Sequence, residues 1–179
     1  MANYYYFVPS LPAIRSDSES FMSVEDFLAL CRPRISRKDY GILSRVALTD
    51  DVVKGNDFVE GYTRFRSMVN RELAWQRSQA LGMSGDEYVN DGEKDALVTS
   101  AVKKAVMEVD PLEGERILLS LYFDYLDRNI GFGHEWDLTF LISYALKLQL
   151  LARRNAFTRD RGRAEFDSLF GQLRREIFE

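Results

Sequence analysis

The stretch of sequence that decides the fold runs from Asp137 to Phe157 and reads DLTFLISYALKLQLLARRNAF. Its apolar residues follow one long helical pattern, which Lys147 and Gln149 interrupt and two arginines close. An apolar core of about fifteen residues makes a helix of roughly 22 Å, whereas crossing a bilayer takes about 20 apolar residues. The stretch therefore predicts the central helix of a water-soluble domain rather than a membrane-spanning helix.

Amphipathic helical patterns recur along the rest of the chain. They follow residues that favour a helix N-cap, namely Ser23, Ser36, Asn56 or Asp57, and Asp110. Asp110 is the strongest signal, because proline follows it at the first helical position. A last amphipathic helix is expected after a break at 158–162. We predict a mainly α-helical bundle, with 1–179 as a single domain and 1–50 as an N-terminal helical-hairpin subregion.

One segment departs from the helical pattern. The aromatic run Tyr4–Val8 is typical of a β-strand and ends at Pro9. We therefore expect a short N-terminal strand or extended segment here, placed against the helical bundle.

Composition limits the class of protein. Of the 179 residues, 46% are hydrophobic, which is enough for a packed core, and the formal net charge is −4 with a pI of about 5.2. An acidic chain is not a general nucleic-acid binder, because such proteins usually carry a basic face. Cys31 is the only cysteine, which indicates an intracellular protein, and the N-terminus has no signal-peptide pattern. We expect a cytoplasmic protein, which docks at the cytoplasmic face of the inner membrane if its partner is a membrane complex.

The sequence offers little catalytic chemistry. His134 is the only histidine, and it stands beside Glu135 and Asp137 without a His-Glu-x-x-His spacing. We interpret it as a loop histidine and assign no catalytic residue, cofactor or metal. The alternative from another class is a helical enzyme with a carboxylate or metal site built from Glu72, Glu115 and His134.

Polar residues within the apolar helical faces are the candidate structural or partner-contact residues. They are Arg71, Glu72, Arg77, Glu115, Lys147, Gln149 and Arg153. We expect Lys147 to pair with Glu72 or Glu115 inside the bundle, because a charge within an apolar helix needs a partner. A structural role is favoured over a contact with a partner protein.

Arginines crowd the region after the apolar helix. The candidate basic patch consists of Arg154, Arg159, Arg161 and Arg163. Cations near a helix C-terminus are the ordinary explanation, and a surface for an anionic partner or for phospholipid headgroups is the more specific one. The second explanation leads to a further alternative, a free-standing regulatory module that binds its partner through this patch.

Several motifs resemble a family. The opening Tyr4-Tyr5-Tyr6-Phe7-Val8-Pro9-Ser10-Leu11-Pro12 resembles the Tyr-Tyr-Tyr-Leu-x-x-Ser-Leu-Pro start of an uncharacterised bacterial family encoded among V-type ATPase subunits. The further pieces are Glu25-x-Phe27-Leu28, Arg71-Glu72-Leu73-Ala74-x-x-Arg77, Asp110-Pro111-Leu112-x-x-Glu115 and Tyr144-Ala145-Leu146-Lys147-Leu148-Gln149-Leu150-Leu151-x-Arg153.

This resemblance implies a function without catalysis. It suggests a subunit or assembly factor of a V/A-type rotary ATPase, similar to part of the funnel-like adaptor of these ATPases. That adaptor is helical and joins the central stalk to the membrane ring. The implied partners are stalk or ring subunits, and the implied membrane association is peripheral. The resemblance carries over no catalytic residues.

Overall fold

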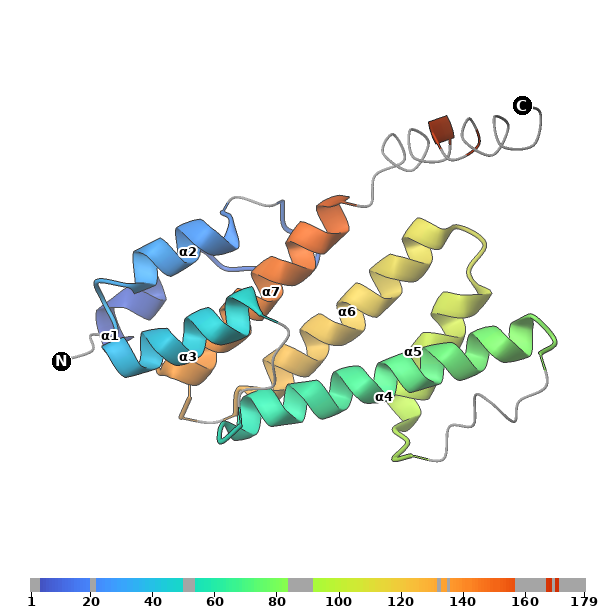
Figure 1. Ribbon diagram of the computed structural model, residues 1–179, viewed down its shortest axis with the longest axis horizontal. Coiled ribbons are helices and arrows are strands. Elements are labelled where there is room, and N and C mark those ends of the chain that lie inside the picture. The colour runs from blue at the N-terminus through green and yellow to red at the C-terminus, as the bar shows by residue number, and fades with distance from the viewer. Residues whose placement is uncertain are drawn as a thin grey trace, which may run out of the picture.

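The computed structural model describes residues 4–19, 22–49, 54–83, 92–131, 133–134, 136–156, 167–168 and 170. In chain order its elements are α1 (Tyr4–Phe7), the 3₁₀ turn η1 (Val8–Ser10), α2 (Val24–Cys31), α3 (Arg37–Leu48), α4 (Asp57–Ala80), α5 (Ala96–Met107), α6 (Pro111–Asn129) and α7 (Leu138–Ala156) (Figure 1). All of these elements are helical. The prediction of a mainly α-helical bundle is therefore confirmed.

The helices pack on one another in a definite order. On one side of α7 lie α2 and α3, and on its other side lies α6 (Figure 1). Next to α6 lies α5, and α4 packs mainly against α5. Helix α7 is therefore the element that joins the N-terminal helices to the α4–α6 group.

The burial of α7 confirms that this helix is central. All eight residues from Leu141 to Leu148 are buried, and Leu151 is buried as well. A helix that packs on one face alternates buried and exposed positions, so this continuous buried run means that neighbours surround the middle part of α7 on all sides. The helix begins after Asp137, whose carboxylate accepts a hydrogen bond of 2.7 Å from the amide of Thr139.

The predicted helix starts are confirmed by their caps. The side chains of Ser23 and Ser36 each accept a hydrogen bond from the amide three residues later. Asn56 caps α4 in the same way, and Asp110 caps α6 ahead of Pro111. Each cap satisfies an amide that has no partner within its own helix, which explains why these short polar residues mark the boundaries.

The expectation of a strand or extended segment over Tyr4–Val8 is wrong, because these residues form α1 and the start of η1. A strand needs a neighbouring strand for its backbone groups, and the described residues contain no strand. A helical turn satisfies those groups locally and still buries Phe7 and Val8. Pro9 fits within the first turn of η1, where its missing amide donor costs nothing.

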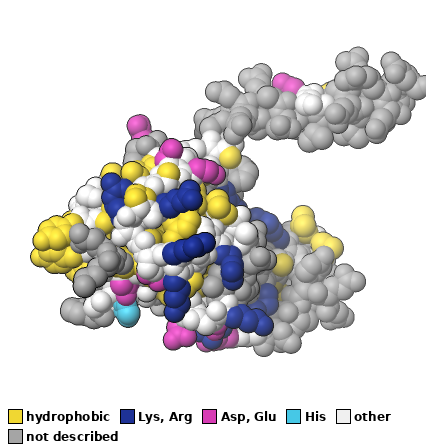
Figure 2. Space-filling view, turned by 60° about the vertical axis from the view of Figure 1, so that its left-hand side comes forward, with side chains coloured by type: hydrophobic (Ala, Val, Ile, Leu, Met, Phe, Trp, Pro, Cys, Tyr) yellow, Lys and Arg dark blue, Asp and Glu magenta, His cyan; other side chains and the backbone are white. Residues whose placement is uncertain are grey.

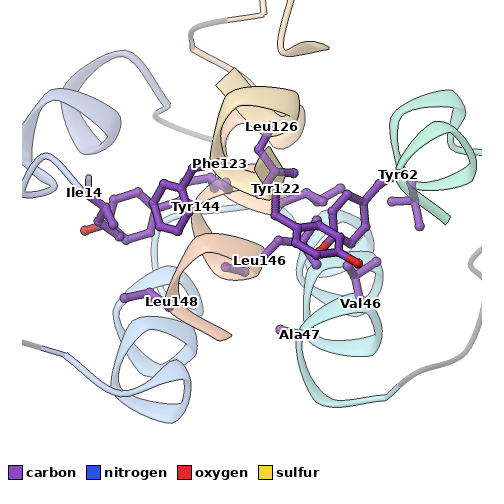
Figure 3. Close-up of a cluster of buried hydrophobic side chains, with 14 of the residues drawn as sticks. Ile14, Val46, Ala47, Tyr62, Tyr122, Phe123, Leu126, Tyr144, Leu146 and Leu148 are labelled. Carbon is purple, nitrogen blue, oxygen red and sulfur yellow. The ribbon is translucent and has the colours of Figure 1, made fainter. Parts of the chain in front are cut away.

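The core is a continuous cluster that several helices share. Figure 3 shows Tyr122 and Leu126 of α6 among Tyr62 of α4 and Leu146 of α7. Cys31, the last residue of α2, is fully buried, and burial raises the pKa of its thiol to about 12. Cys31 is therefore a small residue of the core.

Two features complete the fold. Within the described ranges, no helix is long and apolar enough to cross a bilayer. The predicted break at 158–162 lies outside the described residues, and so does most of the predicted last helix, of which Asp167, Ser168 and Phe170 are described as helical.

Helices α5 and α6 approach each other closely at Gly114. A Cβ atom added to Gly114 would lie 2.7 Å from the carbonyl oxygen of Ala105. That oxygen belongs to the backbone and yields only if the whole helix moves. The absence of a side chain at Gly114 therefore sets the distance between α5 and α6.

We expect Gly114→Ala to lower the free energy of unfolding by about 1 to 3 kcal/mol, because the added methyl group overpacks the α5–α6 contact. Gly41→Ala is the matched control, since Gly41 lies exposed within α3 and its added Cβ would meet no atom within 4 Å. The control should raise the free energy of unfolding by about 0.5 to 1 kcal/mol, because alanine favours a helix. Urea denaturation measures the free energy of unfolding of both variants. A stabilising effect of Gly114→Ala would contradict the close approach of α5 and α6 at this residue.

A second prediction concerns Ser143, whose hydroxyl is buried in α7 and has no hydrogen-bond partner among the described residues. Removing such a hydroxyl relieves its desolvation, so Ser143→Ala should raise the free energy of unfolding by about 1 kcal/mol. Ser78 is equally buried, but its hydroxyl donates a hydrogen bond of 2.8 Å to the carbonyl of Trp75. Ser78→Ala should therefore fail to stabilise the protein. Equal changes in the free energy of unfolding for the two substitutions would contradict the role given to the missing hydrogen bond.

Candidate functional site

Lys147 forms its ion pair with a residue that the sequence analysis did not select. Its ammonium lies 2.5 Å from the carboxylate of Asp127 on α6 and 5.7 Å from the centre of the Phe123 ring. The expected pairing with Glu72 or Glu115 is therefore wrong. Glu115 lies about 18 Å farther along the axis of α6, and α4, which carries Glu72, packs mainly on α5 rather than on α7.

The other polar residues of α7 contact its neighbours. Arg153 forms an ion pair of 2.8 Å with Glu115 of α6. Gln149 donates a hydrogen bond of 2.8 Å to the carbonyl of Ala47, near the end of α3. These contacts satisfy polar groups close to the core, and they connect α7 to α6 and α3.

Arg154 is the one member of the candidate basic patch that the structure describes. Its guanidinium donates hydrogen bonds of 2.6 Å to the carbonyls of Ser16 and Ser18, in the segment between η1 and α2. Arg154 therefore contacts the protein's own backbone. The remaining members, Arg159, Arg161 and Arg163, lie outside the described residues.

The candidate residues of α4 point to three different places. Glu72 is buried at 2% exposure, and its carboxylate accepts a hydrogen bond of 2.9 Å from Gln76. Arg71 lies against Gly92, because a Cβ atom added to Gly92 would lie 2.6 Å from the guanidinium of Arg71. Arg77 lines a hollow that it shares with Glu115. The structure therefore does not unite Glu72, Glu115 and Lys147 in one network.

The residues of the alternative enzyme site are separated as well. His134 pairs through Nδ1 with Asp137, in the turn before α7, whereas Glu115 pairs with Arg153. Among the described residues, no group of three or more histidine, cysteine, aspartate or glutamate side chains is placed to hold a metal ion. His134 lies beside the start of a helix, where the sequence analysis expected it.

A polar cleft lies between α4, α6 and α7, and we call it the α4–α7 cleft. Its volume is about 400 Å³, and it is lined by Tyr62, Arg66 and Asn70 of α4, Tyr122 of α6, and Leu146, Gln149, Leu150 and Arg153 of α7. The three α4 residues follow one another at intervals of four, so they share a face of that helix. Two candidate residues, Gln149 and Arg153, therefore reach a common site, together with residues that the sequence analysis did not select.

The electrostatics of the cleft centre on Tyr122. Burial raises the pKa of its hydroxyl, the positive charges of Arg153 and Arg66 oppose that rise, and Glu115 adds to it. Both arginines therefore act on the same phenol from opposite walls. Among the described residues, the lining of the cleft holds these two cations and no carboxylate, and the carboxylate of Glu115 pairs with Arg153 from outside the lining.

A second hollow adjoins the cleft on the side of Glu115. It measures about 240 Å³ and lies between Leu73 and Arg77 of α4 and the α5–α6 turn. Glu115 lines it, while the ion-pair partner Arg153 lines the α4–α7 cleft. The Arg153–Glu115 pair thus joins one residue from the lining of each hollow.

An exposed aromatic patch lies at one end of the molecule. It consists of Tyr5 and Tyr6 of α1 and Trp136, which are 68%, 73% and 46% exposed. The ring centres of Tyr5 and Trp136 are 5.8 Å apart, and those of Tyr5 and Tyr6 are 5.2 Å apart. Figure 2 shows hydrophobic side chains gathered at one end of the visible face, near the histidine. The exposure of three adjacent aromatic side chains is unusual for a surface without a binding role.

Comparison of this chain with protein-family models, with curated proteins and with solved structures finds no match. The family resemblance of the sequence motifs therefore remains a prediction.

The Lys147–Asp127 pair is asymmetric, because the side chain of Lys147 is 11% exposed and that of Asp127 is 59% exposed. Removing Asp127 leaves a buried ammonium without this carboxylate, so Asp127→Ala should lower the free energy of unfolding by about 1 to 3 kcal/mol. Lys147→Met removes the buried charge and leaves Asp127 in contact with water, so its effect should be smaller. Chemical denaturation of both variants measures the difference, and a greater loss for Lys147→Met would contradict this prediction.

Proposed function

We propose that the protein is a non-enzymatic, protein-binding subunit or assembly factor of a V/A-type rotary ATPase. Its place would be that of an adaptor between the central stalk and the membrane ring, at the cytoplasmic face of the membrane. The observation that carries this proposal is the exposed aromatic patch, because two of its residues belong to the motif that resembles the ATPase-associated family.

The three tyrosines of that motif separate into two environments. The hydroxyl of Tyr4 turns inward and donates a hydrogen bond of 2.7 Å to Asp39 of α3. Tyr5 and Tyr6 point away from the core and are mostly exposed. Tyr4 therefore serves the fold, whereas the other two tyrosines need another explanation.

Binding to a protein is that explanation. Aromatic residues are enriched in protein–protein interfaces, where they bury a large area with few rotatable bonds and frequently dominate the binding energy. Tyr5, Tyr6 and Trp136 lie side by side and offer such a contact. The resemblance of the sequence motifs supports a stalk or ring subunit as the partner.

The rest of the molecule suits a rigid adaptor. The polar residues of α7 that could have formed a reactive site instead contact Asp127, Ala47, Glu115 and the segment before α2. Such contacts fix one helix against the others. A body of this kind can hold a partner in a defined position without any chemistry of its own.

Co-purification tests this proposal. We expect the tagged protein, isolated from gently solubilised membranes of its own organism, to bring down ATPase stalk or ring subunits. The variant that combines Tyr5→Ser with Tyr6→Ser should lose at least about nine-tenths of that recovery, because it removes the two most exposed of the three aromatic side chains of the patch. Its melting temperature should stay unchanged, because both side chains are exposed.

Leu81→Ser is the control, since Leu81 is 75% exposed and lies just beyond α4, away from the patch. Its recovery of ATPase subunits should match that of the unchanged protein. If the unchanged protein recovers no stalk or ring subunit, the assignment to the ATPase fails. If the double variant recovers as much as the control, the patch is not the contact surface.

A further inference from the structure

The α4–α7 cleft has the composition of a site for a negatively charged ligand. Arg66 projects from α4 and Arg153 from α7, so two cations reach it from opposite walls. A guanidinium binds a carboxylate with paired hydrogen bonds, and its five N–H donors let one arginine contact more than one carboxylate. The ion pair between Arg153 and Glu115 is already an example of this chemistry.

The cleft also has an apolar part. Leu146 and Leu150 follow each other at a spacing of four on α7, and the ring of Tyr62 lies on the opposite wall. Tyr62 and Leu146 are buried, whereas Leu150 is half-buried. A ligand that fills this space therefore needs an apolar group beside its negative charge.

We propose that the α4–α7 cleft is a docking site for an acidic, amphipathic segment of a partner protein. A carboxylate of the segment would bind Arg66 and Arg153, and an adjacent apolar side chain would pack against Leu150 and Tyr62. The proposal rests on protein binding, which is one part of the proposed function, but it does not depend on which protein the partner is.

The exposure of the arginines favours a protein segment over a small free anion. Small-molecule sites bury most of the surface of their ligand, whereas the side chain of Arg153 remains 57% exposed. An exposed ion pair alone contributes little in water. A protein segment adds the contacts on either side of the carboxylate, which a free anion lacks. A nucleic acid is disfavoured by the net charge of −4.

The experiment uses the full chain and a fluorescein-labelled peptide of about four helical turns, with leucine along one face and glutamate elsewhere. A second peptide carries lysine in place of every glutamate. Fluorescence anisotropy should show binding of the glutamate peptide, with an affinity that falls as sodium chloride is raised. The lysine peptide should bind at least about tenfold more weakly.

Variants connect the binding to the cleft. Arg66→Gln combined with Arg153→Gln should lower the affinity for the glutamate peptide at least about tenfold, because both guanidiniums are lost. Asn70→Trp should lower the affinity for the glutamate peptide as well, because the larger side chain fills the cleft without changing the charge of the cleft. Lys103→Glu is the control, since Lys103 is exposed on α5 and does not line the cleft. Its affinity should stay close to that of the unchanged protein.

Melting temperatures show whether each variant folds, and Asn70→Trp keeps the test decisive if the arginine variant does not. Four outcomes overturn the proposal: equal binding of both peptides, full binding by Asn70→Trp, displacement of the peptide by millimolar succinate, or cleft-dependent binding to phosphatidylglycerol vesicles. The third outcome would indicate a small-anion site and the fourth a lipid site. Because the probe is not an ATPase subunit, failure here is distinct from failure of the co-purification.

Discussion

The burial of α7 from Leu141 to Leu148 is the constraint on which the rest of the structure depends. Polar groups in this buried part of the helix have little access to water, so leaving one without a partner, as with the Ser143 hydroxyl, is costly. Tyr144 illustrates the consequence, since its hydroxyl donates a hydrogen bond of 3.0 Å to the carbonyl of Pro12. Lys147, Gln149 and Arg154 meet the same requirement with Asp127, Ala47 and the segment before α2. The polar residues of α7 thereby fix the position of α6, α3 and the N-terminal segment around it.

Local signals in the sequence predict the helices well, because a cap depends on residues only two or three positions apart. Asp110 and Ser36 could be identified without knowledge of the tertiary structure. The run Tyr4–Val8 could not, because the same aromatic residues suit a strand or a helix and only the available neighbours decide between them. The partner of Lys147 depends on which face of α6 meets α7, and periodicity does not specify that. The cleft brings together Arg66 and Arg153, which no spacing rule connects.

The family resemblance acquires a clearer physical meaning. Its longest motif, Tyr144–Arg153, lies mostly in the buried part of α7, so those residues are explained by packing and by buried polar contacts. A likeness in such a motif concerns the fold more than the partner. The opening motif differs, because Tyr5 and Tyr6 are exposed while Phe7 and Val8 are buried next to them. The exposed half of that motif is therefore the better guide to binding.

The aromatic patch and the α4–α7 cleft lie along the same helix. Trp136 of the patch precedes the first residue of α7, and Arg153 of the cleft lies in its last turn. At 1.5 Å per residue, the first residue of α7, Leu138, and Arg153 are about 22 Å apart along the helix axis. Because neighbours surround the middle of α7, that separation changes little when one surface is occupied. The two proposed contacts, held at this distance, would let a small helical protein orient one partner relative to another, as the proposed adaptor function requires.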